Sequence, residues 1–122
     1  MHGADADIAW ALNGRCWARA LANQGLEQAL QDCNAALRMY PQRAPFLDSR
    51  GLVYLRGGKL DKALADYDAS LQADPKSAWS LYGRGVARIR KGMTAQGQAD
   101  IAAAAVIAPN LAERAQRFGI AP

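Results

Sequence analysis

The stretch that decides the fold is residues 44–75, APFLDSRGLVYLRGGKLDKALADYDASLQADP. Its apolar residues recur at helical spacing on either side of a glycine pair, which predicts two helices joined by a short turn. Pro75 ends the second helix, because a proline pushes the residue before it towards extended backbone. Pro41 and Pro109 lie 34 residues before and after Pro75, so the same helix pair is expected three times.

Other residues recur at the same spacing, which supports a repeat of 34 residues. Helix pairs with a period of this length form solenoids, in which each pair packs on its neighbours. The recurring sets are Asp32, Asp66 and Asp100; Leu37 and Leu71; Ala29 and Ala63; Gly51 and Gly85; and Arg50 and Arg84.

The hydrophobic spacing predicts seven helices in a single domain over residues 7–122, after a flexible tail of residues 1–6. The first helix is expected to start near Asp5 or Asp7, either of which could cap it, and to end at Asn23-Gln24-Gly25. The other six are expected over Leu26–Met39, Pro45–Arg56, Leu60–Ala73, Ala78–Lys91, Thr94–Ile107 and Leu111–Phe118.

The composition suits stacked helices and argues against several classes of protein. Of the 122 residues, 51% are apolar and only 7% are aromatic, which favours an Ala- and Leu-rich core with close helix contacts. No apolar run approaches the roughly 18 residues of a membrane span, and the start of the chain lacks the features of a signal peptide. The net charge of +4 is too small and too scattered to indicate nucleic-acid binding.

Residues 8–118 resemble the tetratricopeptide repeat family, of bacterial type. The resemblance implies an all-α, right-handed superhelix of three antiparallel helix pairs, with repeats at about 10–43, 44–77 and 78–111 and a capping helix at about 111–118. The middle unit carries the family pattern in Leu47, Gly51 and Tyr54 of its first helix, in Ala63, Tyr67 and Ser70 of its second, and in Pro75.

Two details of this pattern predict specific contacts. We expect Gly51 and Ala63 to let their helices approach closely and Tyr67 to fill the space between helix pairs. The first unit departs from the pattern, because Trp17 stands where Gly51 and Gly85 stand later, and Asn13 replaces Leu47 and Leu81. Either the first two helices splay apart, or Trp17 turns outward.

Arginine and aspartate recur together and predict ion pairs, because an arginine near a seam between helices needs an acid. The expected pairs join each second helix to the next first helix, namely Asp32 with Arg50 and Asp66 with Arg84. Pairing within a unit is the alternative, and it would leave Asp32 without a partner.

Cys16 and Cys33 fall on the two helices of one hairpin and are expected to face inward. The favoured interpretation is two buried free thiols, which behave as small apolar residues. A disulfide is the alternative and would imply an oxidising compartment. A cytoplasmic location is therefore expected, and a periplasmic one is the alternative if this disulfide forms or an export signal was removed.

In the family that the chain resembles, the first helices line a concave groove that receives a segment of a partner. Trp79 and Tyr82 are the best candidate anchors, since exposed aromatics beside arginines often hold protein contacts. The alternative for Trp79 is that it only covers a seam between repeats. The expected groove residues are Arg15, Asp48, Ser49, Leu52, Arg56, Trp79, Tyr82, Val86 and Arg90.

Several sharper functions lack the residues that they need. Co-chaperone members of the family clamp a terminal carboxylate with lysine and asparagine, whereas this chain has Gly14, Ala18, Ser49, Trp79 and Gly83 there. With His2 as the only histidine, no nucleophile, histidine and acid set is possible, so no catalytic, cofactor or metal residues are expected. A basic stripe of Arg84, Arg88 and Lys91 is interpreted as a solvated face.

The sequence therefore predicts a non-catalytic scaffold or adaptor that binds a peptide segment of another protein in the concave groove. Arg15, Arg56 and Arg90 would favour an acidic partner. No nucleic-acid partner and no membrane span are expected. The alternatives are a self-assembling solenoid, with a homodimer formed through Trp10 and Trp17, or a docking or regulatory module of a larger enzyme or envelope system.

Overall fold

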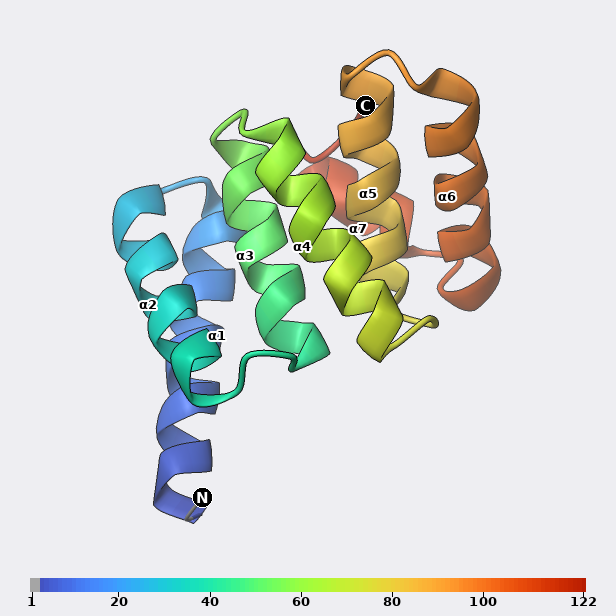
Figure 1. Cartoon of the computed structure of the whole chain (residues 1–122). Helices are drawn as coiled ribbons and strands as arrows, with labels where there is room; N and C mark the ends of the chain where they lie inside the picture. The colour runs from blue at the N-terminus through green and yellow to red at the C-terminus, as the bar shows by residue number, and fades with distance from the viewer. Residues whose placement is uncertain (1–2) are drawn as a thin grey trace.

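The computed structural model describes residues 3–122, and this part of the chain is all-helical (Figure 1). The helix ends agree with the predicted ones to within one residue, apart from the start of the first helix. That helix begins at Gly3, so residues 3–6 were wrongly predicted as a tail; Met1 and His2 lie outside the described residues. The helices are α1 (Gly3–Ala22), α2 (Leu26–Met39), α3 (Ala44–Arg56), α4 (Leu60–Ala73), α5 (Ala78–Arg90), α6 (Thr94–Ile107) and α7 (Leu111–Arg117).

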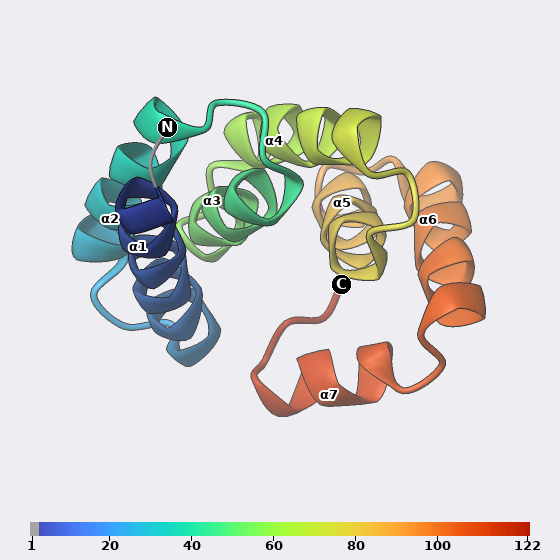
Figure 2. The same ribbon diagram turned by 90° about the horizontal axis from the view of Figure 1, so that it is seen from below.

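The first six helices form three antiparallel pairs that stack side by side. Seen from below, α2, α4 and α6 lie on the outside of an arc, and α1, α3 and α5 lie on its inside (Figure 2). Each inner helix contacts the next inner helix, so the inner faces form one continuous concave side. The predicted superhelix of three pairs and a terminal helix is confirmed. Among residues 3–122, no helix has the length and apolar character to cross a membrane.

Glycines allow the pairs to pack closely around one tyrosine. Tyr67 of α4 is buried, and a Cβ added at Gly83 of α5 would lie 2.3 Å from Cζ of its ring. A Cβ added at Gly51 of α3 would lie 2.9 Å from Cε1 of the same ring. Tyr67 therefore occupies space that only glycine leaves free on both sides, which confirms that it fills the gap between pairs.

The third pair is packed even more tightly, backbone against backbone. A Cβ added at Gly85 of α5 would lie 2.7 Å from the carbonyl oxygen of Gly97 in α6, and one added at Gly97 would lie 2.5 Å from the carbonyl oxygen of Gly85. The two helices therefore cross at a pair of glycines, where any side chain would push them apart.

Buried aspartates pair with arginines of their own unit, so the predicted pairing between units was wrong. Asp66 accepts from Arg50 at 2.8 Å, and Asp100 accepts from Arg84 at 3.0 and 2.9 Å. Asp32 is not stranded, because Arg15 donates two hydrogen bonds to it at 2.7 and 2.8 Å. In the first and third units a second arginine, four residues after the first, also donates to the aspartate: Arg19 to Asp32 and Arg88 to Asp100.

The same arginines also tie neighbouring units together. Arg50 donates to the side-chain oxygen of Asn34 at 3.0 Å, and Arg84 donates to Asp68 at 3.0 Å. Asn34 and Asp68 lie on the second helix of the preceding unit and are 34 residues apart. Each of the two guanidinium groups thus bridges its own helix pair and the previous one, and the planar group suits two acceptors at once.

The first pair is closed by a disulfide between Cys16 of α1 and Cys33 of α2, with a Cα–Cα distance of 5.6 Å. The expectation of two free thiols was therefore wrong. The helices of this pair do not splay apart, since the bridge holds them at a close contact. Trp17 turns towards the concave side, where it is half-buried and packs edge-to-face on Trp79 with ring centroids 5.0 Å apart.

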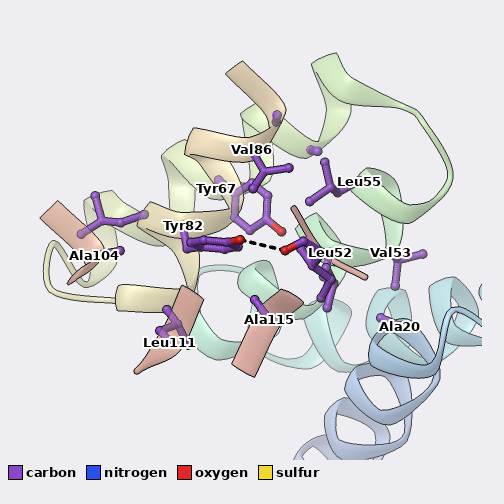
Figure 3. Packing of buried hydrophobic residues seen from close by; sticks show 14 of the residues in the cluster. Ala20, Leu52, Val53, Leu55, Tyr67, Tyr82, Val86, Ala104, Leu111 and Ala115 are labelled. Atoms are coloured by element: carbon purple, nitrogen blue, oxygen red, sulfur yellow. Dashed lines mark hydrogen bonds between the residues drawn. The ribbon is translucent and has the colours of Figure 1, made fainter. Parts of the chain in front are cut away.

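The terminal helix α7 turns back along the inside of the arc, opposite α4 (Figure 2). Leu111 and Ala115 of α7 are buried and lie against Tyr82 of α5 (Figure 3). Val106 on the last turns of α6 stays 84% exposed. The terminal helix therefore covers the inner face of the third pair and leaves the outer face of that pair in solvent.

Candidate functional site

The concave side is the candidate site, and the nine predicted groove residues lie on the three inner helices. Their exposure divides them into a buried floor and an accessible rim. Tyr82 is only 1% exposed, so the expectation that it is an exposed aromatic was wrong. The buried floor comprises Asp48, Ser49, Leu52, Tyr82 and Val86, and the rim comprises Arg56, Trp79 and Arg90. Arg15 is exposed and lies at the seam between α1 and α2, where it binds Asp32.

Part of the floor is in contact with residues 118–122. Ile120 is 1% exposed and belongs to the same buried cluster as Leu52, Tyr82 and Val86. Phe118, two residues earlier, is 47% exposed. Burying one aliphatic side chain removes it from water with a gain of roughly 1.5–3 kcal/mol. Ile120 is therefore the apolar contact by which residues 118–122, here called the tail, occupy the concave side.

Three rim and floor residues bind the backbone of the tail. The hydroxyl of Tyr82 donates to the carbonyl oxygen of Ile120 at 2.8 Å, the bond drawn as a dashed line in Figure 3. Arg90 donates to the carbonyl oxygen of Ala121 at 2.8 Å, and Arg56 donates to that of Phe118. All three donors belong to the predicted groove, so the groove residues contact polypeptide backbone in this structure.

Arg56 makes more hydrogen bonds than Tyr82 or Arg90. Besides Phe118, it donates to the carbonyl oxygens of Ala20 at 3.0 Å and Leu21 at 2.7 Å, at the C-terminal end of α1. A cation is favourable there, because the last carbonyls of a helix carry partial negative charge. Burial, followed by the nearby charge of Arg90, lowers the pKa of Arg56 from its usual range.

The two tryptophans close the other part of the concave side. Trp17 comes from α1 and Trp79 from α5, so their edge-to-face contact spans the second unit and joins the first to the third. Such a contact adds about 0.5–1.5 kcal/mol beyond the area that it buries. Trp79 thus covers a seam between units, which is one of the two roles predicted for it. It also keeps part of its surface in solvent.

A buried carboxyl lies at the N-terminal ends of α3 and α5. Ser80 donates to Asp48 at 2.9 Å, and Ser80 and Ser70 are hydrogen-bonded at 2.7 Å. Burial raises the pKa of Asp48 to about 7, and the hydrogen bond from Ser80 acts in the opposite direction. Asp48 therefore takes up a proton near neutral pH, and the two serines give its carboxyl a polar lining.

The remaining predicted cations already have acidic partners. Arg15 binds Asp32, although its side chain is 59% exposed. Of the basic stripe on α5, Arg84 and Arg88 bind Asp100, and Lys91 binds Asp61. The stripe is thus a set of ion pairs, and free positive charge is not concentrated there.

The tail was missed at the level of sequence. The only signal for it was the apolar run Phe118-Gly119-Ile120-Ala121-Pro122, which follows the polar residues of the last predicted helix. Gly119 has φ of 78°, a left-handed conformation that glycine adopts without strain, and it directs the chain from α7 into the groove.

Other hollows of the surface offer less. An open depression of about 780 Å³ lies at the loop between α2 and α3, lined by residues 39–45, Ala73 and Asp74. Arg43, at its edge, lies over the ring of Tyr40 at 4.3 Å, a cation–π contact that stabilises the loop. Within residues 3–122, no three histidine, cysteine or acidic side chains come together as metal ligands would.

Comparison with known proteins agrees with this architecture. Residues 51–92, from α3 to the end of α5, match the family model described as TPR repeat. Among solved structures, the TPR domain of Arabidopsis OM64 superposes with a TM-score of 0.80 at 17% sequence identity, covering 94% of this chain and 93% of that one. A search of the curated proteins gives no match. The chain therefore contains a tetratricopeptide repeat and has the fold of a tetratricopeptide-repeat domain along its length.

Proposed function

We propose that the chain is a non-catalytic adaptor that binds a peptide segment of another protein on its concave side. Tetratricopeptide domains generally mediate protein–protein interaction, which sets the class of function. The observation that carries the proposal for this chain is the seating of the tail: Arg56, Tyr82 and Arg90 each bind one of its backbone carbonyls. Donors arranged in this way suit polypeptide irrespective of its side-chain charge.

The partner need not be acidic. Arg15 is committed to Asp32, and Arg56 is committed to the carbonyl oxygens of Ala20 and Leu21, which lie outside the tail. These two arginines would have to break existing bonds in order to attract carboxylates of a partner. We therefore place the recognition in backbone hydrogen bonds and apolar contact, with Trp79 as the accessible aromatic at the rim.

The test is capture of partners from a lysate of the source cells, followed by mass spectrometry. The variant is Trp79→Ala and its matched control is Trp10→Ala. Each tryptophan packs edge-to-face on one aromatic ring, Trp79 on Trp17 at 5.0 Å and Trp10 on Phe46 at 4.9 Å, and only Trp79 faces the concave side. A partner that is lost with Trp79→Ala and kept with Trp10→Ala supports the proposal. Equal capture by both variants contradicts it.

A second candidate is self-association through the outer face of α6. This helix ends in Val106 and Ile107, which are 84% and 45% exposed, and its outer residues are mostly alanine. The first unit also exposes apolar side chains, Ile8 at 53% and Trp10 at 43%, although Trp17 packs on Trp79. Light scattering of the wild-type chain and of Val106→Glu over a range of concentrations separates the two candidates. A dimer that Val106→Glu dissociates favours self-association.

We also propose an oxidising compartment, with the periplasm as the example, for the mature chain. The support is the Cys16–Cys33 disulfide, because such bonds persist in oxidising surroundings and are rare in the cytosol. Alkylation of thiols in protein taken directly from its source, under denaturing and non-reducing conditions, tests the proposal. Two alkylated cysteines would place the protein in a reducing compartment.

A further inference from the structure

The tail is bound as a peptide ligand would be bound, although it belongs to the same chain. Its contacts divide into two kinds. The first kind is to backbone: three carbonyl oxygens, those of Phe118, Ile120 and Ala121, each accept a bond from an inner helix. Every residue type presents such carbonyls, so these bonds fix the course of the segment and say little about its sequence.

The second kind of contact is to one side chain. Ile120 alone is buried, at 1% exposure, whereas Phe118 is 47% exposed and Pro122 is exposed. The residues around Ile120 in the buried cluster include Leu52, Tyr82 and Val86, all of them apolar or aromatic. The concave side therefore selects a branched aliphatic side chain at one position and tolerates variety on either side of it.

The connection of the tail to the rest of the chain is slight. It follows a helix of only seven residues, α7, and helices this short are marginal without tertiary contacts. Between α7 and Ile120 stand Phe118 and Gly119, whose amides bond to the carbonyls of Ala115 and Gln116. Local opening of such a short element requires less free energy than global unfolding.

We infer that the tail is an intramolecular ligand that a partner displaces, and that the partner segment carries a branched aliphatic residue in the place of Ile120. This inference rests on the proposed function and specifies the chemistry of its ligand. A partner segment must compete with the tail, which is tethered to the same chain. The bound tail therefore lowers the apparent affinity for the partner by a factor close to the equilibrium ratio of tail-bound to tail-free chains.

The experiment uses a fluorescein-labelled peptide of residues 114–122, RAQRFGIAP, titrated with the full-length chain and followed by fluorescence anisotropy. The key variant is Ile120→Asp, because a carboxylate is not buried in an apolar cluster without a partner. The matched control is Phe118→Ala, which changes an exposed side chain of the same tail and keeps its carbonyl. We expect Ile120→Asp to bind the peptide at least about tenfold more tightly than the wild type, and Phe118→Ala to bind it as weakly as the wild type.

The result that overturns the inference is a helical Ile120→Asp chain that binds the peptide no more tightly than the wild type. Tight binding of a peptide in which aspartate replaces its own Ile120 would also overturn it, as would a dimer of wild-type chains that exchange their tails. If Ile120→Asp fails to fold, hydrogen exchange on the wild-type chain replaces it. Saturating peptide should then speed exchange of the Ile120 amide at least about tenfold and leave the amides of α3 unchanged, and equal rates would overturn the inference.

Partner capture separates this inference from the proposed function. If wild type and Ile120→Asp capture the same amount of a partner that depends on Trp79, and excess peptide does not compete, the adaptor function stands and the tail inference fails. If neither form captures a partner but the peptide binds the opened groove, the adaptor function fails and the ligand chemistry of the groove is supported.

Discussion

The first helix pair and the two later ones are joined at the same place by different chemistry. In the second pair Gly51 lets α3 approach Tyr67 of α4, and in the third pair Gly85 lets α5 approach α6 beside Ile101. In the first pair a disulfide joins α1 to α2. In each pair, one contacting residue comes directly after the arginine of the ion pair, and the other comes directly after the aspartate. The three units therefore share one ion pair and one close contact, but only the first contact is covalent.

The comparison also corrects the register of α1. Arg15 and Asp32 are 17 residues apart, whereas Arg50–Asp66 and Arg84–Asp100 are 16 apart. The helix α1 thus carries one residue more after its arginine than α3 and α5 do. Counted from the ion pairs, Cys16 and not Trp17 takes the place of Gly51.

The same count aligns Asn13 with two residues of the inner face in later units, Asp48 and Tyr82. Tyr82 bonds to the tail and Asp48 bonds to Ser80, whereas Oδ1 of Asn13 is buried without a hydrogen-bond partner. The departure that the sequence seemed to show in the first unit is therefore largely a shift by one residue. The 34-residue spacing assigns equivalent residues by their distance along the chain, whereas the ion pairs assign them by their positions in the structure.

Removing the covalent link should have the largest effect. The double variant Cys16→Ala, Cys33→Ala is expected to lose about 3 kcal/mol of unfolding free energy, because a bridge over 17 residues restricts the unfolded chain by about that much. Chemical denaturation of oxidised wild type, reduced wild type and the variant measures the loss. Equal stability of oxidised and reduced wild type would show that the first pair needs no bridge.

Filling the glycine contact of the third pair should come next. Gly85→Ala is expected to cost about 2–3 kcal/mol, since its Cβ would lie 2.7 Å from a backbone oxygen that cannot move aside alone. The control is Gly14→Ala, which lies on α1 with nothing within 4 Å and should raise stability slightly. Thermal unfolding of both variants checks the pair. Equal melting temperatures would show that α5 and α6 are free to separate.

The buried carboxyl predicts a pH dependence. The pKa of Asp48 is about 7 in the folded chain and lies near 4 in unfolded peptides, so the folded state holds the proton more strongly. Stability from this group is complete below about pH 4 and is lost as pH rises to about 7. Asp48→Asn should therefore be more stable than wild type at pH 8, by about 2 kcal/mol, and lose that advantage at pH 4. Chemical denaturation of both proteins at pH 8 and pH 4 measures this. The same stability difference at both pH values would exclude ionisation of Asp48 as its cause.

At the equivalent position of the first unit, the expected effect is smallest. Asn13→Leu should raise stability by about 1 kcal/mol, because it replaces a buried oxygen without a partner by an apolar group of similar size. Thermal unfolding measures the change. A loss of stability would mean that the amide of Asn13 makes a bond through water, and Asn13→Asp would then be better tolerated than Asn13→Leu.

Local spacing predicted most of the architecture and few of the partners. The helix ends and the role of Tyr67 follow from residues close in sequence, such as Pro75 and Gly51, and these predictions are confirmed. The choice of Arg15 and not Arg50 for Asp32 depends on how α1 is rotated against α2, which the 34-residue spacing does not contain. The positions of Cys16 and Cys33 on one hairpin were predicted, but their oxidation is a property of geometry and surroundings.

The nine expected groove residues lie on the three inner helices, and their role in partner binding stays a prediction. What sequence reasoning missed is that the tail binds three of them, Arg56, Tyr82 and Arg90. A seven-residue helix and five further residues are too short to show hydrophobic periodicity. A single apolar residue such as Ile120 does not indicate where it packs.

Arg56 has a consequence for how the molecule unfolds. In most repeat proteins each unit touches only its neighbours, and unfolding can start at one end and stop partway. Here one guanidinium binds Ala20 in the first unit and Phe118 at the far end of the chain, spans of 36 and 62 residues. With the Trp17–Trp79 contact, these bonds turn a row of units into a closed ring of contacts. The domain should therefore melt in one cooperative step, with no half-folded array in between.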